Sequence, residues 1–170
     1  NVLVLRKGAQ QEMNSGIGRQ NASIIGGFPF VAVGADGLPM LSPETFVVVP
    51  LDRRDQGGMA NVVVRGVSQR AFEVRKGITI TAGRTFNSGA REVVVGAAFA
   101  ARFPNSSVGD VLRFAETDWT VVGQFSAGGG AFESEVWGEN EQFMPVFRGQ
   151  IFQSVTFRMK DPAAFDGIKQ

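Results

Sequence analysis

Short runs of β-branched and apolar residues, separated by glycine and polar residues, recur along this chain and predict strands. In the first half, the expected strands cover residues 2–7, 43–51 and 61–68. Between the last two lie the polar, glycine-containing residues 52–60, which indicate a long loop. These two strands should therefore form a hairpin.

The second half of the chain repeats this pattern at closer spacing. Its expected strands cover residues 78–81, 91–96, 109–115 and 118–125, and the sequence AETD at 115–118 predicts a hairpin turn. The chain has 22 glycines, many of them at the expected turns. This part of the chain should form a compact, curved, β-rich lobe.

Three segments have helical patterns. Residues 15–28 place apolar side chains at roughly helical spacing, although each glycine among them weakens a helix by about 1 kcal/mol relative to alanine. Residues 97–103 predict a short helix that Pro104 ends. Near the C-terminus, Asp161 can cap a helix whose first residue is Pro162.

The two ends of the chain resemble each other. NVLVLRK at residues 1–7 and SVTFRMK at residues 154–160 are apolar, seven-residue strands with Val second and Lys last. Each precedes a helical segment, which suggests a weak internal repeat of β-α type. The β-rich lobe would lie between the two copies.

Composition limits the chemistry that this chain can perform. Its 170 residues are 44% hydrophobic, enough for the core of one domain of one or two lobes. The 17 basic and 16 acidic residues are interspersed, so nucleic-acid binding is not expected. Without cysteine or histidine, the chain cannot build an ordinary zinc site, a disulfide or a Ser-His-Asp relay. We expect no metal or cofactor.

Neither a membrane span nor a signal peptide is expected in this chain. Its longest uncharged run, residues 20–35, is shorter than the roughly 20 apolar residues that a span needs and contains Gly, Pro, Gln and Asn. The first residues contain no Met, basic region or cleavage-like site. The predicted last helix stops without a C-terminal cap. We therefore interpret the chain as an excised part of a longer protein.

The stretch GQFSAGGGAFESEVW, residues 123–137, most resembles a working site. A phosphate-binding loop requires Gly-Lys-Ser/Thr at the start of a helix, and here Ala131 and Phe132 follow the glycines. Gly128, Gly129 and Gly130 are instead candidates for a mobile hinge or loop tip.

Three residues beyond the glycines are candidates for a contact face. Glu133 and Glu135 lie two apart and could serve as the acid and base of a glycoside hydrolase. Their alternation with Phe132, Ser134 and Val136 is, however, typical of a strand with one solvated face. We expect Glu133, Glu135 and Trp137 to lie outward on such a strand and to contact a partner.

Seven stretches together are similar to the MacB-like periplasmic core domain of ABC transporter permeases. No single motif is diagnostic, and the order of the elements carries the match. The stretches are NVLVLRKGAQQEMNSGI, VRGVSQRAFEVRKGITITAGRTF, REVVVGAAFAARF, VGDVLRF, WTVVGQF, ESEVW and SVTFRMKDPAAFDGIKQ.

The resemblance implies an α+β fold in two lobes. An α/β lobe of two β-α-β-type halves would comprise residues 1–60 and 150–170, and an inserted β-rich lobe would comprise residues 61–149. Family members carry this domain between the first and second of four membrane helices. The final part of the second half is missing here, which puts the edge pairing of the α/β lobe in question.

The resemblance also implies a non-enzymatic role in a bacterial cytoplasmic membrane, with this domain on the periplasmic or extracellular side. A nucleotide-binding ATPase would be the partner, and an adaptor, lipoprotein or peptide a further one. The transporter would be a dimer and the isolated fragment a monomer. Two alternatives stay open: a secreted carbohydrate-active enzyme that uses carboxylates, and a stand-alone extracytoplasmic binding module.

Overall fold

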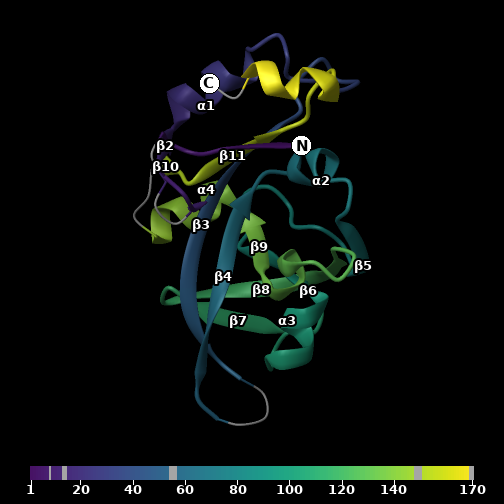
Figure 1. Ribbon diagram of the computed structural model, residues 1–170. Helices are drawn as coiled ribbons and strands as arrows, with labels where there is room; N and C mark the ends of the chain where they lie inside the picture. Colours follow the sequence, from purple (N-terminus) through teal and green to yellow (C-terminus); the bar gives the residue numbers. More distant parts are fainter. Residues whose placement is uncertain (8, 13–14, 54–56, 148–150, 169–170) are drawn as a thin grey trace.

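The computed structural model describes residues 1–7, 9–12, 15–53, 57–147 and 151–168. Within these residues the fold is α+β, as the sequence predicted, with one nine-stranded mixed sheet in the order β1-β11-β3-β4-β9-β6-β8-β5, and β7 pairs with β8 (Figure 1). The strands of this sheet are β1 (Val2–Val4), β3 (Leu41–Asp52), β4 (Met59–Val67), β5 (Thr79–Gly83), β6 (Glu92–Gly96), β7 (Val111–Phe114), β8 (Thr117–Ser126), β9 (Val136–Glu139) and β11 (Ser154–Phe157).

The remaining elements are short. A separate two-stranded sheet pairs β2 (Ile17–Gly18) with β10 (Ile151–Phe152). The α-helices are α1 (Arg19–Gly26), α2 (Ala71–Val74), α3 (Ala97–Arg102) and α4 (Asn140–Val146), and the 3-10 helices are η2 (Ala131–Ser134) and η3 (Pro162–Ile168).

The β3–β4 hairpin runs through most of the length of the molecule (Figure 1). Residues 41–44 of β3 pair with β11, and residues 45–52 pair with β4. One continuous strand therefore joins the sheet formed by the two chain ends to the β-rich part. The division into two lobes at residues 60/61 and 149/150 stays a prediction.

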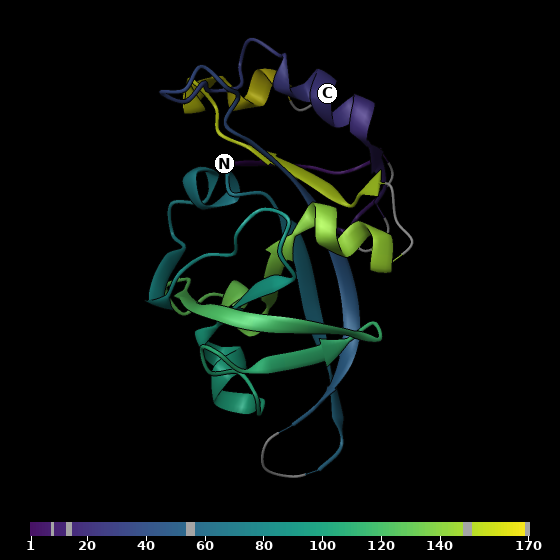
Figure 2. The same cartoon turned by 180° about the vertical axis from the view of Figure 1, so that it is seen from behind.

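The segments near the two chain ends gather at one end of the molecule. Strands β1 and β11 pair antiparallel there. Figures 1 and 2 show α1 and η3 beyond these strands, at the end opposite β7 and α3. The resemblance between residues 1–7 and 154–160 thus corresponds to two neighbouring, antiparallel strands.

The main core lies where β7 and β8 pack against the β3–β4 hairpin. Val62 and Val64 of β4 are buried there with Trp119, whose ring meets that of Phe143 edge-on at 4.8 Å. The run Val93, Val94 and Val95 in β6 does not alternate with polar residues, because both faces of β6 are covered. Val93 and Val95 pack in the main core, and Val94 packs in a second core on the other face.

Several expected elements differ in the structure. The expected helix at residues 15–28 is the shorter α1, preceded by β2, and the expected last helix is the 3-10 helix η3. The expected strand at residues 132–137 is wrong, because η2 occupies its first half and β9 begins at Val136. A glycine explains this geometry. A Cβ on Gly96 would lie 2.1 Å from the Glu133 carbonyl oxygen, so η2 packs directly against the backbone of β6.

Candidate functional site

An arginine near the end of β4 is the centre of a buried charge cluster. Arg65 interrupts a run of valines, and its side chain is only 3% exposed. All five of its guanidinium N–H groups donate hydrogen bonds, each to a carboxylate oxygen. This arginine is therefore saturated by acceptors from the same chain.

Three glutamates from distant parts of the chain accept these bonds. Glu135, which directly precedes β9, accepts from Arg65 Nε at 2.7 Å and from Nη2 at 3.2 Å. Glu12, between β1 and β2, accepts from both terminal nitrogens at 2.9 Å. Glu44 of β3 accepts from Nη1 at 3.0 Å. A single side chain thus connects β4 to three other segments.

A second arginine extends this arrangement toward the C-terminal strand. Arg75, directly after α2, donates to Glu44 at 2.7 Å and to the Thr156 hydroxyl of β11 at 3.1 Å. Ser154 of β11 donates to Glu12 at 3.0 Å. We call Glu12, Glu44, Arg65, Arg75 and Glu135 together the Arg65 cluster.

Aromatic side chains cover the Arg65 cluster. The Phe132 ring centre lies 5.2 Å from the guanidinium carbon of Arg65 and 4.6 Å from that of Arg75, within cation-π range. Phe46 lies 5.4 Å from the guanidinium carbon of Arg65. Trp137 donates its indole N–H to Glu135 at 3.0 Å. Few water molecules can reach these charges, which strengthens their attraction.

The charges in the cluster shift each other's pKa values. Burial alone would raise the pKa of Glu12, but the hydrogen bonds and the positive charge of Arg65 outweigh burial, so this pKa lies below its ordinary value of 4.5. Burial disfavours the charged form of Arg65, yet the hydrogen bonds that it donates to Glu135 and Glu12 raise its pKa. Both shifts favour the ionised forms of Glu12 and Arg65 at neutral pH.

Chemically, this arrangement suits mechanical linkage better than proton transfer. The two oxygens of Glu44 already accept from Ser42, Arg65 and Arg75. Arg65 has no donor left for another group. A saturated, buried ion network fixes the relative positions of its strands, and removing Arg65 leaves Glu135 buried without a cation.

The glycine loop predicted from the sequence lies at one side of this region. Gly128, Gly129 and Gly130 are exposed, and the first two have positive φ angles of 63° and 80°. One carboxylate oxygen of Glu133 accepts from the backbone N–H groups of Ala127 and Gly129. Glu133 thus holds the preceding glycine loop in place through these hydrogen bonds. A hinge or partner role for the glycines stays a prediction.

Two of the predicted contact residues do not lie on an outer face. Glu135 is 6% exposed and Trp137 is fully buried. The expectation that Glu133, Glu135 and Trp137 share one solvated face is wrong, because η2 ends the alternation and turns Glu135 toward Arg65. Nor do Glu133 and Glu135 face a common space, as the acid and base of a glycosidase require.

Sequence reasoning missed Glu12, Glu44, Arg65 and Arg75. A signal for one of them was present, since a lone arginine within NVVVRGVS stands in a strand that is otherwise apolar. Its partners carried no local signal, because they lie 21 to 70 positions away along the chain.

Comparisons with known proteins agree with this architecture. The chain matches the family described as the MacB-like periplasmic core domain over residues 2–170. No curated protein matches it. Among the described residues, no helix is long and apolar enough to cross a membrane.

Two solved structures share its fold at low sequence identity. The extracellular domain of the noncanonic ABC-type transporter YknZ from Gram-positive bacteria is 13% identical, with a TM-score of 0.69 over 97% of this chain and 86% of that one. The periplasmic region of MacB from Actinobacillus actinomycetemcomitans is 14% identical, with a TM-score of 0.71 over 97% of this chain and 78% of that one. On the family match, this chain belongs to the MacB-like periplasmic core domains.

Proposed function

We propose that this chain is the extracytoplasmic, non-catalytic domain of an ABC transporter permease. In this role it couples ATP hydrolysis in the cytoplasm to movement or release of a substrate or partner outside the membrane. Membership of the MacB-like periplasmic core domains supports the proposal. So do the two structural neighbours, which are the extracytoplasmic parts of transporters.

The observation that carries the coupling role is the Arg65 cluster. It ties the segment after β1, through Glu12, and β11, through Ser154 and Thr156, to β4 and β9. In the proposed permease, movement of the membrane helices would enter through the segments that hold β1 and β11. The buried ion pairs then carry this movement into the β-rich part without a change in internal geometry.

The proposed assembly follows from this role. An ATPase subunit or domain of the same transporter supplies the energy, and the transporter is a dimer whose membrane and nucleotide-binding parts hold it together. The 170-residue chain alone is monomeric. The domain faces the periplasm or the extracellular side of a bacterial cytoplasmic membrane. Light scattering of the isolated chain tests its monomeric state, and a tight dimer in dilute solution contradicts it.

The complete gene gives a direct test of the permease context. We expect one hydrophobic helix encoded before this domain and three after it, with an ATPase fused or encoded nearby that carries a nucleotide-binding motif. A complete reading frame without such helices would overturn the proposal.

Spin labels in the full transporter test the coupling role. This chain has no cysteine, so Gln10→Cys and Arg113→Cys provide its labelling positions, both exposed, near β1 and on β7, once any cysteine elsewhere in the transporter is replaced. We expect ATP to leave the distance between these labels within one subunit unchanged and to alter the distance between the two Arg113→Cys labels of the dimer. Adding Glu12→Gln should broaden the distribution of distances between the two labels within one subunit. A wild-type distance within the subunit that changes with ATP contradicts rigid coupling.

A further inference from the structure

The outer half of β4 has a backbone edge without a strand partner in the described chain. β9 pairs only with residues 64–67 of β4, whereas β4 continues back to Met59 along β3. The hydrogen bond from Arg53 N to the Gly58 carbonyl shows which residue pairs of the β3–β4 ladder are hydrogen-bonded. Since bonded pairs alternate in an antiparallel ladder, the backbone groups of Met59, Asn61 and Val63 point away from β3.

The position of a proline agrees with this hydrogen-bond pattern. Pro50 lies opposite Asn61, where the ladder requires no N–H donor from β3. The N–H and C=O groups of Asn61 and the N–H group of Val63 are therefore available to another strand, whereas the Val63 carbonyl faces Val136 of β9. Exposed edges of this kind are sites where proteins pair with additional chains.

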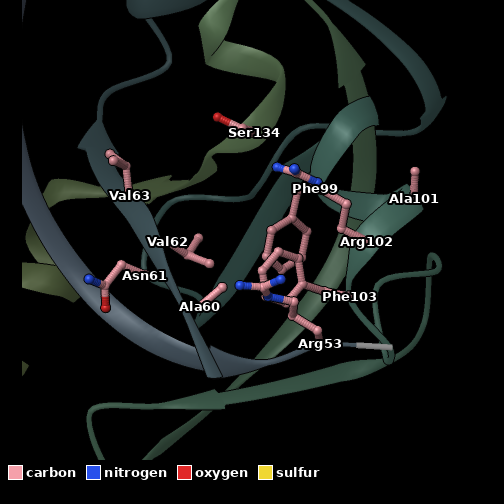
Figure 3. A pocket seen from close by; sticks show the side chains of 10 residues that line it. All are labelled: Arg53, Ala60, Asn61, Val62, Val63, Phe99, Ala101, Arg102, Phe103 and Ser134. Atoms are coloured by element: carbon pink, nitrogen blue, oxygen red, sulfur yellow. The ribbon is translucent and has the colours of Figure 1, made fainter. Parts of the chain in front are cut away.

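A groove runs along this open edge. Its volume is about 420 Å³, in the range of ligand-binding pockets, and it separates β4 from α3 (Figure 3). The rings of Phe99 and Phe103, stacked with their centres 4.5 Å apart, form part of its wall. Asn61 and Val63, whose backbone groups face outward, both line it. The groove and the free edge are thus one site.

Two arginines give this groove a positive charge. Arg53 and Arg102 line it, and Figure 3 shows their guanidinium groups directed toward the ring of Phe99 from opposite sides. In the part of the chain that the structure describes, neither side chain has a carboxylate partner. Six other arginines there do: Arg19, Arg65, Arg70, Arg75, Arg84 and Arg113.

We propose that this groove binds an extended acidic segment of a partner protein, which adds to β4 as a further strand. The backbone of the segment pairs with Asn61 and Val63, and its carboxylates meet Arg53 and Arg102. Alternating donors and acceptors on the edge fit a peptide backbone better than they fit a small anion. Guanidinium groups without a carboxylate partner among the described residues favour added carboxylates, which they can bind in a bidentate manner. The site does not depend on the proposed transporter role.

A synthetic peptide tests this binding with the 170-residue chain. The probe is a capped octapeptide of alternating valine and glutamate, titrated into isotope-labelled protein while amide chemical shifts are followed. We expect shifts at residues 59–63 and in α3. Methylation of every second peptide nitrogen on the pairing side should abolish binding, because a strand needs those N–H groups.

Variants of the two arginines test the charge requirement. Arg53→Ala with Arg102→Ala should weaken binding about tenfold, and Arg53→Glu with Arg102→Glu should switch the preference to a lysine-containing peptide. The matched control is Arg91→Ala, because Arg91 is exposed, lies outside the groove and has no carboxylate partner among the described residues. It should leave binding unchanged.

Four results of the peptide titration would overturn the proposal. They are no shift at millimolar peptide, equal binding of the lysine-containing peptide by the wild-type chain, equal binding of the methylated peptide, and displacement of the peptide by inorganic phosphate at similar concentration. The last result would identify a site for small anions. Dimerisation of the chain through residues 59–63 without peptide would also overturn it, since the edge would then serve a second copy of the chain.

Discussion

Arg65, near the end of β4, and the two groove arginines, Arg53 directly after β3 and Arg102 at the end of α3, have different surroundings. Arg65 is buried, and its five donors are all bonded to carboxylates. Arg53 and Arg102 line an open groove and have no carboxylate partner among the described residues. The difference shows that the type of residue does not reveal its role. Burial and pairing separate an arginine that holds the fold together from one that is available to a partner.

The largest expected effect comes from removing Arg65. Arg65→Met leaves Glu135 buried without a cation and Glu44 with Arg75 alone, so we expect a loss of about 3–5 kcal/mol in the free energy of unfolding. Urea denaturation monitored by tryptophan fluorescence measures it. The control is Arg113→Ala, which breaks an ion pair whose side chains are 64% and 66% exposed and should cost less than about 1 kcal/mol. Equal losses for the two variants would show that burial does not matter here.

A smaller effect on stability is expected for Glu12, which lies at the edge of the Arg65 cluster. The Glu12 side chain is 15% exposed, and Arg65 keeps two other carboxylates when Glu12 is replaced. We expect Glu12→Gln to cost about 1–2 kcal/mol. A double-mutant cycle with Ser154→Ala, whose hydroxyl donates to Glu12, should give a coupling energy of about 0.5 kcal/mol or more. A coupling energy of zero would contradict the contact between these two segments.

The pH dependence should distinguish the cluster from the groove. Because the pKa of Glu12 is lowered in the folded chain, its stabilising effect is complete above about pH 4.5 and is lost as pH falls through the folded pKa. Unfolding free energy should therefore decrease on acidification below that pH. Glu12→Gln should make this decrease shallower, whereas Arg53→Ala should leave it unchanged. Parallel curves for the wild type and Glu12→Gln would contradict the assignment.

The smallest expected effect belongs to the groove. Arg53→Ala and Arg102→Ala should each change the free energy of unfolding by less than about 0.5 kcal/mol, because both side chains are exposed and unpaired with a described carboxylate. Thermal and urea unfolding measure this. A loss above 1 kcal/mol for either variant would show that the arginine serves stability, as Arg65 does.

Sequence patterns predicted local structure better than long-range contacts. The strands at β4, β6 and β8 were predicted because β-branched runs between glycines leave few alternatives. The strand expected at residues 132–137 failed because η2 packs on Gly96, a contact between distant segments that the alternation in these residues does not reveal. The order of elements was enough to identify the family.

The charge cluster was not predictable in the same way. Glu12 and Glu135 meet at Arg65 only because β4 lies beside β9 and the segment after β1 folds over both, which no local pattern encodes. Trp137 was interpreted as exposed because polar residues follow it, yet β9 is buried on the side that holds its ring. The groove depends equally on the register between β3 and β4.

Hydrogen exchange tests most directly whether the Arg65 cluster unites the segments near the chain ends with the β-rich part. The amides of β1 and β11 and those of β4 and β9 should open with the same free energy in the wild type. In Arg65→Met, the amides of β1 and β11 should open at lower free energy than those of β8, which has no residue in the cluster. Separate opening of these strands in the wild type, or a uniform decrease across all strands in the variant, would contradict the coupling role.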